Sequence, residues 1–199
     1  MDVEQIQLLR DLGDAMRLIA PEQKDGTGKE GKKGIMNGIG KDSAGKDYFN
    51  PKGTTTRAMV TTVLWRIAGS PKSTAALPYT DVPEGQWYTE AVRWAAANGL
   101  LINVTTGNKF EPNATIAREQ FADVIYRFEQ FKAGGKLEKP AYQLNFSDLN
   151  LLSDWAKDSM NWCNVNKIIN GNANGTLNPK GSTTRAELAQ ILLNYKDFN

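Results

Sequence analysis

The stretch LNPKGSTTRAE at residues 177–187 decides the fold. It combines an apolar residue two positions before a Pro with an Arg six positions after that Pro, and this combination occurs three times in the chain. The three pairs are Pro51 with Arg57, Pro112 with Arg118, and Pro179 with Arg185. Because self-similarity of this kind is typical of repeat proteins, we predict three related units.

Each of the three arginines opens a predicted amphipathic helix. Offsets of +3, +6, +7 and +10 from the Arg are apolar in every unit, which is one stripe of a helix. The stripes consist of Val60, Val63, Leu64 and Ile67, then Phe121, Val124, Ile125 and Phe128, then Leu188, Ile191, Leu192 and Tyr195. In the third unit Thr184 and Glu187 have the spacing of a capping box, whereas Ala117 in the second unit has no capping hydroxyl.

A second shared block precedes two of these helices. Tyr-Thr-Asp at residues 79–81 stands before Trp87, and Phe-Ser-Asp at residues 146–148 stands before Trp155. Offsets of +4, +7 and +8 from each Trp continue a helical face, which predicts a further helix in each unit. One unit therefore reads as a helix, a loop rich in Gly and Asn, an extended piece anchored by Pro, and a second helix.

The repeat boundaries divide the chain into residues 1–70, 71–132 and 133–199. Each repeat has too small a core to fold alone, so the three are predicted to pack together. The first repeat diverges, since it has no Trp in the place of the later two and carries a polar stretch rich in Gly and Lys at residues 22–33. We predict that this stretch is a mobile insertion and that residues 133–140 are a linker.

The composition excludes several classes of function. With 24 Lys and Arg against 22 Asp and Glu, the chain of 199 residues has a formal charge of only +2, which argues against nucleic acid as a partner. There is no His and a single Cys, which excludes His-dependent catalysis, disulfides within the chain and the usual zinc sites. We therefore predict no metal and no cofactor. A glycosidase with two carboxylates remains a rival reading, but no paired Asp and Glu stand out.

The sequence also bears on the membrane and on secretion. No segment reaches the roughly 18 consecutive apolar residues of a membrane span. Residues 2–20 carry charges that interrupt any apolar core of a signal peptide, so an extracellular role would require a processed or partial chain.

These motifs together resemble the S-layer homology (SLH) repeat. The resemblance rests on Thr-Arg-Ala-Glu at 184–187, on the Phe-Ser-Asp block with its Trp, and on the loop with its Pro, and it covers residues 34–199. The corresponding residues are Thr-Arg-Ala-Met at 56–59 and Ala-Arg-Glu-Gln at 117–120, so the Arg is present in all three units and the Glu in one. The implied fold is mainly α, with three helix-loop-helix repeats packed as a pseudo-threefold spindle with short extended segments.

The resemblance also implies a function. SLH modules are non-catalytic anchors at the bacterial cell surface or cell wall, and their ligand is an anionic, often pyruvylated, secondary cell-wall polysaccharide or a modified peptidoglycan. The ligand grooves lie between neighbouring repeats. A rival reading is a structural or assembly module with degenerate glycan sites that self-associates in a surface layer, since two of the three motifs have lost the Glu.

The candidate ligand-binding residues are one Arg per unit and the paired Asp and Trp of the upstream blocks: Arg57, Arg118, Arg185, Asp81, Asp148, Trp87 and Trp155. An Arg at a helix start lies where a cation is mildly disfavoured, but a guanidinium beside a free helix N-terminus is a good carboxylate receptor. Alternatively, each Arg pairs with a carboxylate of the neighbouring unit, such as Asp81 or Asp148. The aspartates are more typical of turns and caps, and the tryptophans of a core than of a sugar-stacking surface.

Overall fold

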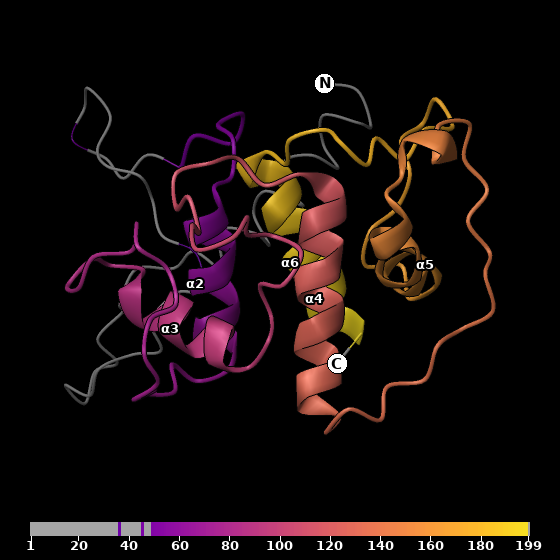
Figure 1. Ribbon diagram of the computed structural model, residues 1–199. Helices are drawn as coiled ribbons and strands as arrows, with labels where there is room; N and C mark the ends of the chain where they lie inside the picture. The colour runs from indigo at the N-terminus through magenta and orange to yellow at the C-terminus, as the bar shows by residue number, and fades with distance from the viewer. Residues whose placement is uncertain (1–35, 37–44, 46–48, 199) are drawn as a thin grey trace, which may run out of the picture. The chain divides into compact units, whose positions relative to one another are not determined.

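A computed structural model describes residue 36, residue 45 and residues 49–198. The described part is mainly helical, as the sequence predicts, and extended pairing is limited to isolated bridges such as Thr56 with Thr115 and Ala117 with Ser182. The helices are α2 (Arg57–Ile67), α3 (Thr89–Ala97), α4 (Arg118–Lys132), η1 (Leu149–Leu151), η2 (Asp154–Ala156), α5 (Lys157–Val165) and α6 (Arg185–Phe198) (Figure 1). The predictions for residues 1–33, including the insertion at 22–33, lie outside the described residues.

The described residues fall into two compact units. One is Thr54–Thr183, which holds α2 to α5, and the other joins Thr184–Asp197 to the segment that ends at Gly53. In the unit Thr54–Thr183, α4 is the central helix, and α2 and α5 both pack against it, on its two sides in Figure 1. Among the helices of the described residues, none is long and apolar enough to cross a membrane.

The three predicted arginines are the first residues of α2, α4 and α6. Their apolar stripes are buried: every predicted position except Ile67 is at most 5% exposed. Local chemistry explains these starts, because Thr56 Oγ1 accepts the amide of Met59 at 3.3 Å and Thr184 Oγ1 accepts that of Glu187 at 3.2 Å. The Glu187 carboxylate accepts the Thr184 amide at 2.7 Å, which confirms the capping box.

The two Trp-containing helices confirm the predicted place of the second Trp of each block but not that of the first. Trp94 and Trp162 are buried at 4% and 3% exposure, and they pack on Phe128 and Tyr126 of α4. However, α3 begins at Thr89 and α5 at Lys157, after the first Trp of each block. The expectation that the earlier tryptophans belong to the core is therefore wrong, because a turn or a 3-10 helix, η2, places them outside the helical register.

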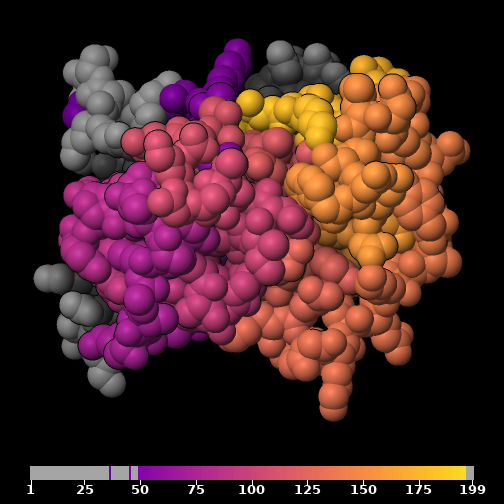
Figure 2. Space-filling model, viewed as in Figure 1, coloured from indigo at the N-terminus to yellow at the C-terminus, as the bar shows by residue number. Residues whose placement is uncertain are grey.

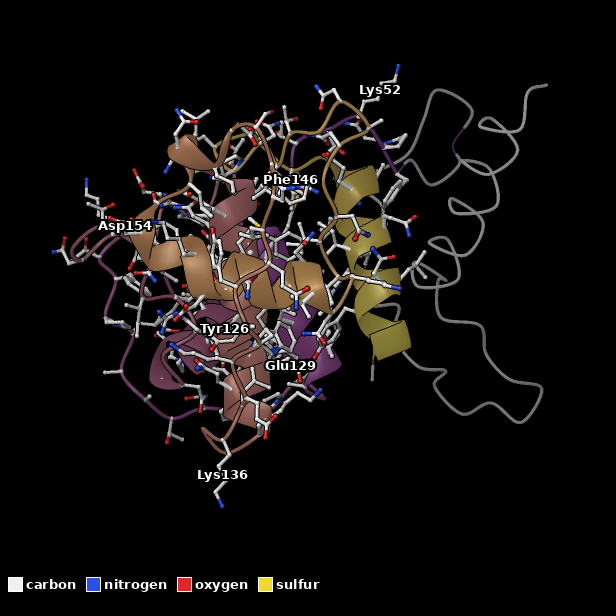
Figure 3. The ribbon with its side chains drawn as sticks, turned by 90° about the vertical axis from the view of Figure 1, so that its right-hand side faces the viewer. Lys52, Tyr126, Glu129, Lys136, Phe146 and Asp154 are labelled. Atoms are coloured by element: carbon white, nitrogen blue, oxygen red, sulfur yellow. The ribbon has the colours of Figure 1, made fainter. Side chains whose placement is uncertain are left out.

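The predicted linker is exposed, and the segment directly after it is hydrogen-bonded to α5. Residues 133–140 follow α4 on the surface, and the segment begins at the lower edge of Figure 2. Gly134 and Gly135 turn the chain with positive φ, and Lys136 projects from the tip in Figure 3. Just beyond, the Asn161 side chain of α5 accepts the Gln143 amide at 2.8 Å and donates to nearby carbonyls. The return path of the linker is thus fixed to α5.

The one cysteine of the chain gives a first prediction. Cys163 is fully buried in α5, and burial raises the pKa of its thiol well above the usual range. Because the thiolate is the reactive form, iodoacetamide should not modify Cys163 in the native protein at pH 8 and should modify it completely in urea. Mass spectrometry of the intact chain measures this, and stoichiometric labelling under native conditions would show that α5 opens readily.

Candidate functional site

The two aspartates of the upstream blocks each hold a loop of their own repeat. Asp81 accepts the backbone amides of Phe110 and Glu111 at 2.8 and 2.7 Å. Asp148 accepts those of Leu177 and Asn178, both at 2.8 Å. Their partners are therefore neither the adjacent turn nor the arginines, but the loop about 30 residues farther along the chain.

The rest of each block supports the same loop. The amide of Thr80 donates to the Asn108 carbonyl at 2.9 Å, and that of Ser147 donates to the Gly175 carbonyl at 3.1 Å. Phe146, labelled in Figure 3, lies so close to Gly171 that an added Cβ there would lie 2.0 Å from its ring. A glycine is therefore required at this position.

The loops held in this way in the second and third repeats present a turn whose geometry also occurs in the first repeat. The residue before the Pro has a positive φ in each case: 51° at Asn50, 54° at Glu111 and 55° at Asn178. Its carbonyl accepts the amide three positions later, at distances of 2.9 to 3.1 Å. This conformation is uncommon for residues other than Gly, and Asn adopts it more readily than Glu.

The helix starts dock onto these turns. In α2, α4 and α6 the first two amides donate to two carbonyls of a loop in another repeat. For the first and second repeats this loop belongs to the repeat that follows, and for the third repeat it belongs to the first. The bonds run from Arg57 to Ala114 and Ala58 to Pro112, from Arg118 to Gly181 and Glu119 to Pro179, and from Arg185 to Gly53 and Ala186 to Pro51, at 2.8 to 3.1 Å. The expectation of free helix N-termini is therefore wrong, because the first two amides of these helices already have backbone partners.

The three guanidinium groups reach the same region in different ways. Arg57, 9% exposed, donates through Nη1 to the Phe110 carbonyl at 3.0 Å and to the Glu111 carboxylate at 2.7 Å. Arg185, 4% exposed, donates through Nε to the Phe49 carbonyl at 2.7 Å and stacks on the Phe49 ring at 4.6 Å. Each arginine is thus fixed beside the turn that its helix contacts. The predicted pairing with a carboxylate of the next repeat occurs at Arg57, but with Glu111.

Arg118 lies in a region with a charged cluster. It donates through Nη2 to the Asn170 carbonyl at 2.6 Å. The next residue, Glu119, is only 3% exposed, and its carboxylate accepts the amide and hydroxyl of Ser153, both at 3.0 Å. Lys180 forms an ion pair with the same carboxylate. Within the described residues, no group of three or more His, Cys, Asp and Glu could hold a metal ion.

Sequence reasoning missed this cluster. Its signal is a comparison of repeats: the position of Glu119 is occupied by Ala58 and Ala186 in the other two, and the position of Lys180 is occupied by Lys52 in the first. Lys52 is exposed, and its side chain points outward from its loop in Figure 3. Thus two of the three turns carry a Lys directly after the Pro.

The two candidate tryptophans are solvent-accessible. Trp87 is 58% exposed and Trp155 is 40% exposed. Trp155 stands two residues after Ser153, which is a partner of Glu119 at the start of α4, so it belongs to the same part of the molecule as Arg118. An exposed indole ring offers a large flat apolar surface. Exposure is what a sugar-stacking role requires of both rings, and the role itself stays a prediction.

Residues 78–122 and 145–189 match the family model of the S-layer homology domain. These two segments are S-layer homology domains. Each match begins one residue before the aromatic residue of an upstream block and ends within the helix that starts at the Arg. It therefore contains the Asp that holds the loop, the turn and the guanidinium group. The two matches confirm the sequence resemblance for these repeats, and they point to the bacterial cell surface or cell wall.

Known relatives share these repeats. The chain is 31% identical over 144 residues to an amylopullulanase of Thermoanaerobacterium thermosulfurigenes, covering 72% of this chain and 8% of that protein. It is 32% identical over 148 residues to an S-layer protein of Bacillus thuringiensis subsp. finitimus, covering 74% and 17%. It is 24% identical over 149 residues to a cellulosome-anchoring protein of Acetivibrio thermocellus, covering 72% and 32%. The chain thus spans less than a third of each relative, and together they support a cell-surface anchoring module.

The contacts of Asp148 lead to a prediction on stability. Burial alone would raise the pKa of this carboxyl, but the hydrogen bonds from the Leu177 and Asn178 amides outweigh it and lower the pKa below the usual value. We expect Asp148→Asn to lower the free energy of unfolding by about 1 kcal/mol at pH 7, because the side-chain NH₂ cannot accept the second amide.

The pH dependence follows from the direction of this shift. A lowered pKa in the folded state contributes stability above the unfolded-state value of about 3.9 and loses it as the pH falls through the folded value. Urea unfolding at pH 7 and pH 3 should therefore show a smaller difference between wild type and Asp148→Asn at the lower pH. The exposed Glu138 of the linker provides the control substitution Glu138→Gln. An equal deficit at both pH values would contradict the role of the charge.

Proposed function

We propose that this chain is a non-catalytic anchoring module that binds an anionic cell-wall polymer, either a pyruvylated secondary polysaccharide or peptidoglycan. The observation that carries the proposal is the equivalent placement of Arg57, Arg118 and Arg185. Each is the first residue of a helix. The first two amides of that helix donate to the turn of another repeat, and the guanidinium group of the same Arg is held beside that turn. Such a repeated cation has no evident value for helix stability, since it stands at the positive end of the helix dipole.

The chemistry of these groups fits a carboxylate-bearing sugar. A guanidinium binds a carboxylate with charge-assisted hydrogen bonds, which are stronger than neutral ones. Because the arginines are held by backbone carbonyls and, at Arg185, by an aromatic ring, little conformational freedom remains to be lost on binding. The exposed rings of Trp87 and Trp155 supply apolar faces for the sugar ring itself.

We further propose that the three repeats pack with pseudo-threefold symmetry. The support is the identical pattern of hydrogen bonds from each helix start to a turn, from the first repeat to the second, from the second to the third and from the third to the first. A glycan site would then occur once per pair of repeats.

Co-sedimentation with purified cell-wall sacculi tests the proposed function. We expect the protein to sediment with intact sacculi and to remain in solution after the secondary polymer has been extracted. Binding that survives extraction points to peptidoglycan as the ligand. If the protein sediments with neither preparation but forms regular assemblies on its own, the chain is an assembly module with degenerate glycan sites.

The tryptophans provide a separate prediction. Trp87→Ala and Trp155→Ala should each weaken binding to sacculi several-fold and leave the melting temperature nearly unchanged, because both side chains lie at the surface, at 58% and 40% exposure. The matched control is Trp162→Ala, which removes a buried ring and should cost about 3–5 kcal/mol of stability. Differential scanning fluorimetry and co-sedimentation together separate the two effects. Unchanged binding in both variants would exclude stacking by these rings.

A further inference from the structure

We infer that Glu111 closes the site around Arg57 to acidic ligands. The inference rests on the proposed function and specifies that one of the three equivalent positions does not carry it out. It is based on one ion pair and on a difference between the repeats at the turn.

The ion pair occupies the Arg57 guanidinium. Nη1 donates to the Glu111 carboxylate at 2.7 Å and to the Phe110 carbonyl at 3.0 Å. The Arg57 side chain is 10% exposed and the Glu111 side chain is 50% exposed, so a buried guanidinium is paired with a carboxylate on a partly exposed side chain. A ligand carboxylate would need the same donors and would also be repelled by the charge already there.

The other two turns have no carboxylate at this position. Asn50 and Asn178 take the place of the glutamate, and the residue after the Pro is Lys52 or Lys180 where the second repeat has Asn113. The first and third turns therefore read Asn-Pro-Lys, and the second reads Glu-Pro-Asn. Relative to the other two, the second turn has lost one positive charge and gained one negative charge.

Packing explains why the glutamate reaches out. At the first and third turns the asparagine side chain folds back over a glycine: a Cβ added at Gly53 would lie 2.5 Å from Asn50 Nδ2, and one added at Gly181 would lie 2.1 Å from Asn178 Nδ2. The equivalent residue in the second repeat is Ala114, whose Cβ fills that space. The side chain at position 111 is thus directed away from its own turn, and it meets Arg57.

Two variants open the site in different ways. Glu111→Gln removes the charge and keeps the size of the side chain. The triple variant Glu111→Asn, Asn113→Lys, Ala114→Gly transplants the turn of the other repeats and also places Asn in the left-handed conformation that it tolerates better. Glu138→Gln is the control, because it removes the same charge from an exposed position in the linker.

The probe is the methyl glycoside of an N-acetylhexosamine with a pyruvate ketal, and its methyl ester is the uncharged control. Side-chain Nε–H signals of arginine are followed by NMR during titration. In wild type we expect the Arg118 and Arg185 signals to shift and the Arg57 signal to stay in place. In Glu111→Gln or in the transplanted turn, Arg57 should respond as well, with an affinity raised by about tenfold or more, because a competing charge-assisted contact is gone.

The outcomes are distinct. An Arg57 signal that shifts in wild type as strongly as the other two, or that responds in neither opened variant, overturns the inference and leaves the proposed function standing. An Arg57 response in Glu138→Gln would overturn it too, by showing that net charge rather than the local carboxylate controls binding. If no arginine signal responds in any of the proteins, the proposed function fails and the inference fails with it.

Discussion

Arg185→Ala should weaken binding to an acidic wall oligosaccharide more than Arg118→Ala or Arg57→Ala does. We expect a loss of about 1.5–3 kcal/mol, the usual value of a hydrogen bond to a charged group, which corresponds to roughly 10- to 150-fold in the dissociation constant. Isothermal titration calorimetry of the three single variants measures it.

The reason lies in how well the guanidinium is held before the ligand arrives. Thr184 and Glu187 form the complete capping box of α6, and the Phe49 ring and carbonyl fix the Arg185 side chain. At α4, the Gln120 side chain accepts the Ala117 amide at 3.1 Å, but Ala117 has no side-chain acceptor to return. A better-ordered site loses less conformational freedom on binding and so retains more of the interaction energy.

Controls must separate binding from folding, because Arg185 is buried. Arg185→Lys keeps the charge but loses the planar fork of donors, so it should recover only part of the affinity. Each variant is checked by its unfolding transition. Equal losses at all three arginines would show that the caps do not matter, and no loss at any of them would favour the assembly module over the anchor.

Lys180→Ala should destabilise the fold by about 2 kcal/mol, because it leaves the buried Glu119 carboxylate without its cation. This is less than for a fully buried pair, since the Lys180 side chain is 53% exposed and Ser153 still donates two hydrogen bonds to the carboxylate. The free energy of unfolding in urea is the measurement.

A matched rescue makes the argument specific. Glu119→Ala introduces the residue that the other two repeats have at this position, so the double variant Lys180→Ala with Glu119→Ala should recover most of the lost stability. The double-mutant cycle should then give a coupling energy of about 1–2 kcal/mol. If the two losses simply add, the ion pair has no energetic role and the stability of the cluster comes from packing.

Local signals in the sequence predicted the helices that begin at Arg57, Arg118 and Arg185, because the cap residues and apolar stripe lie within about ten positions of each Arg. Burial of Trp94 and Trp162 followed from the same periodicity. The same periodicity wrongly extended these two helices back to the first Trp of each block, where the chain is not yet helical.

The contacts that build the site were out of reach for a different reason. Asp148 and its loop are 30 residues apart, and Glu119 and Lys180 are 61 residues apart, so nothing in either local neighbourhood reveals the partner. Likewise, the occupied helix amides depend on a loop of another repeat. The difference between the three sites could have been predicted from the sequence, because two turns read Asn-Pro-Lys and the other reads Glu-Pro-Asn.

The central claim is that an acidic cell-wall sugar binds at the arginines beside the turns. A crystal structure of this chain with a fragment of the pyruvylated wall polymer tests it most directly. We expect a ligand carboxylate in contact with the guanidinium of Arg185 or Arg118, with Glu111 still paired to Arg57. A sugar bound at a surface remote from all three arginines, with their contacts unchanged, would contradict it.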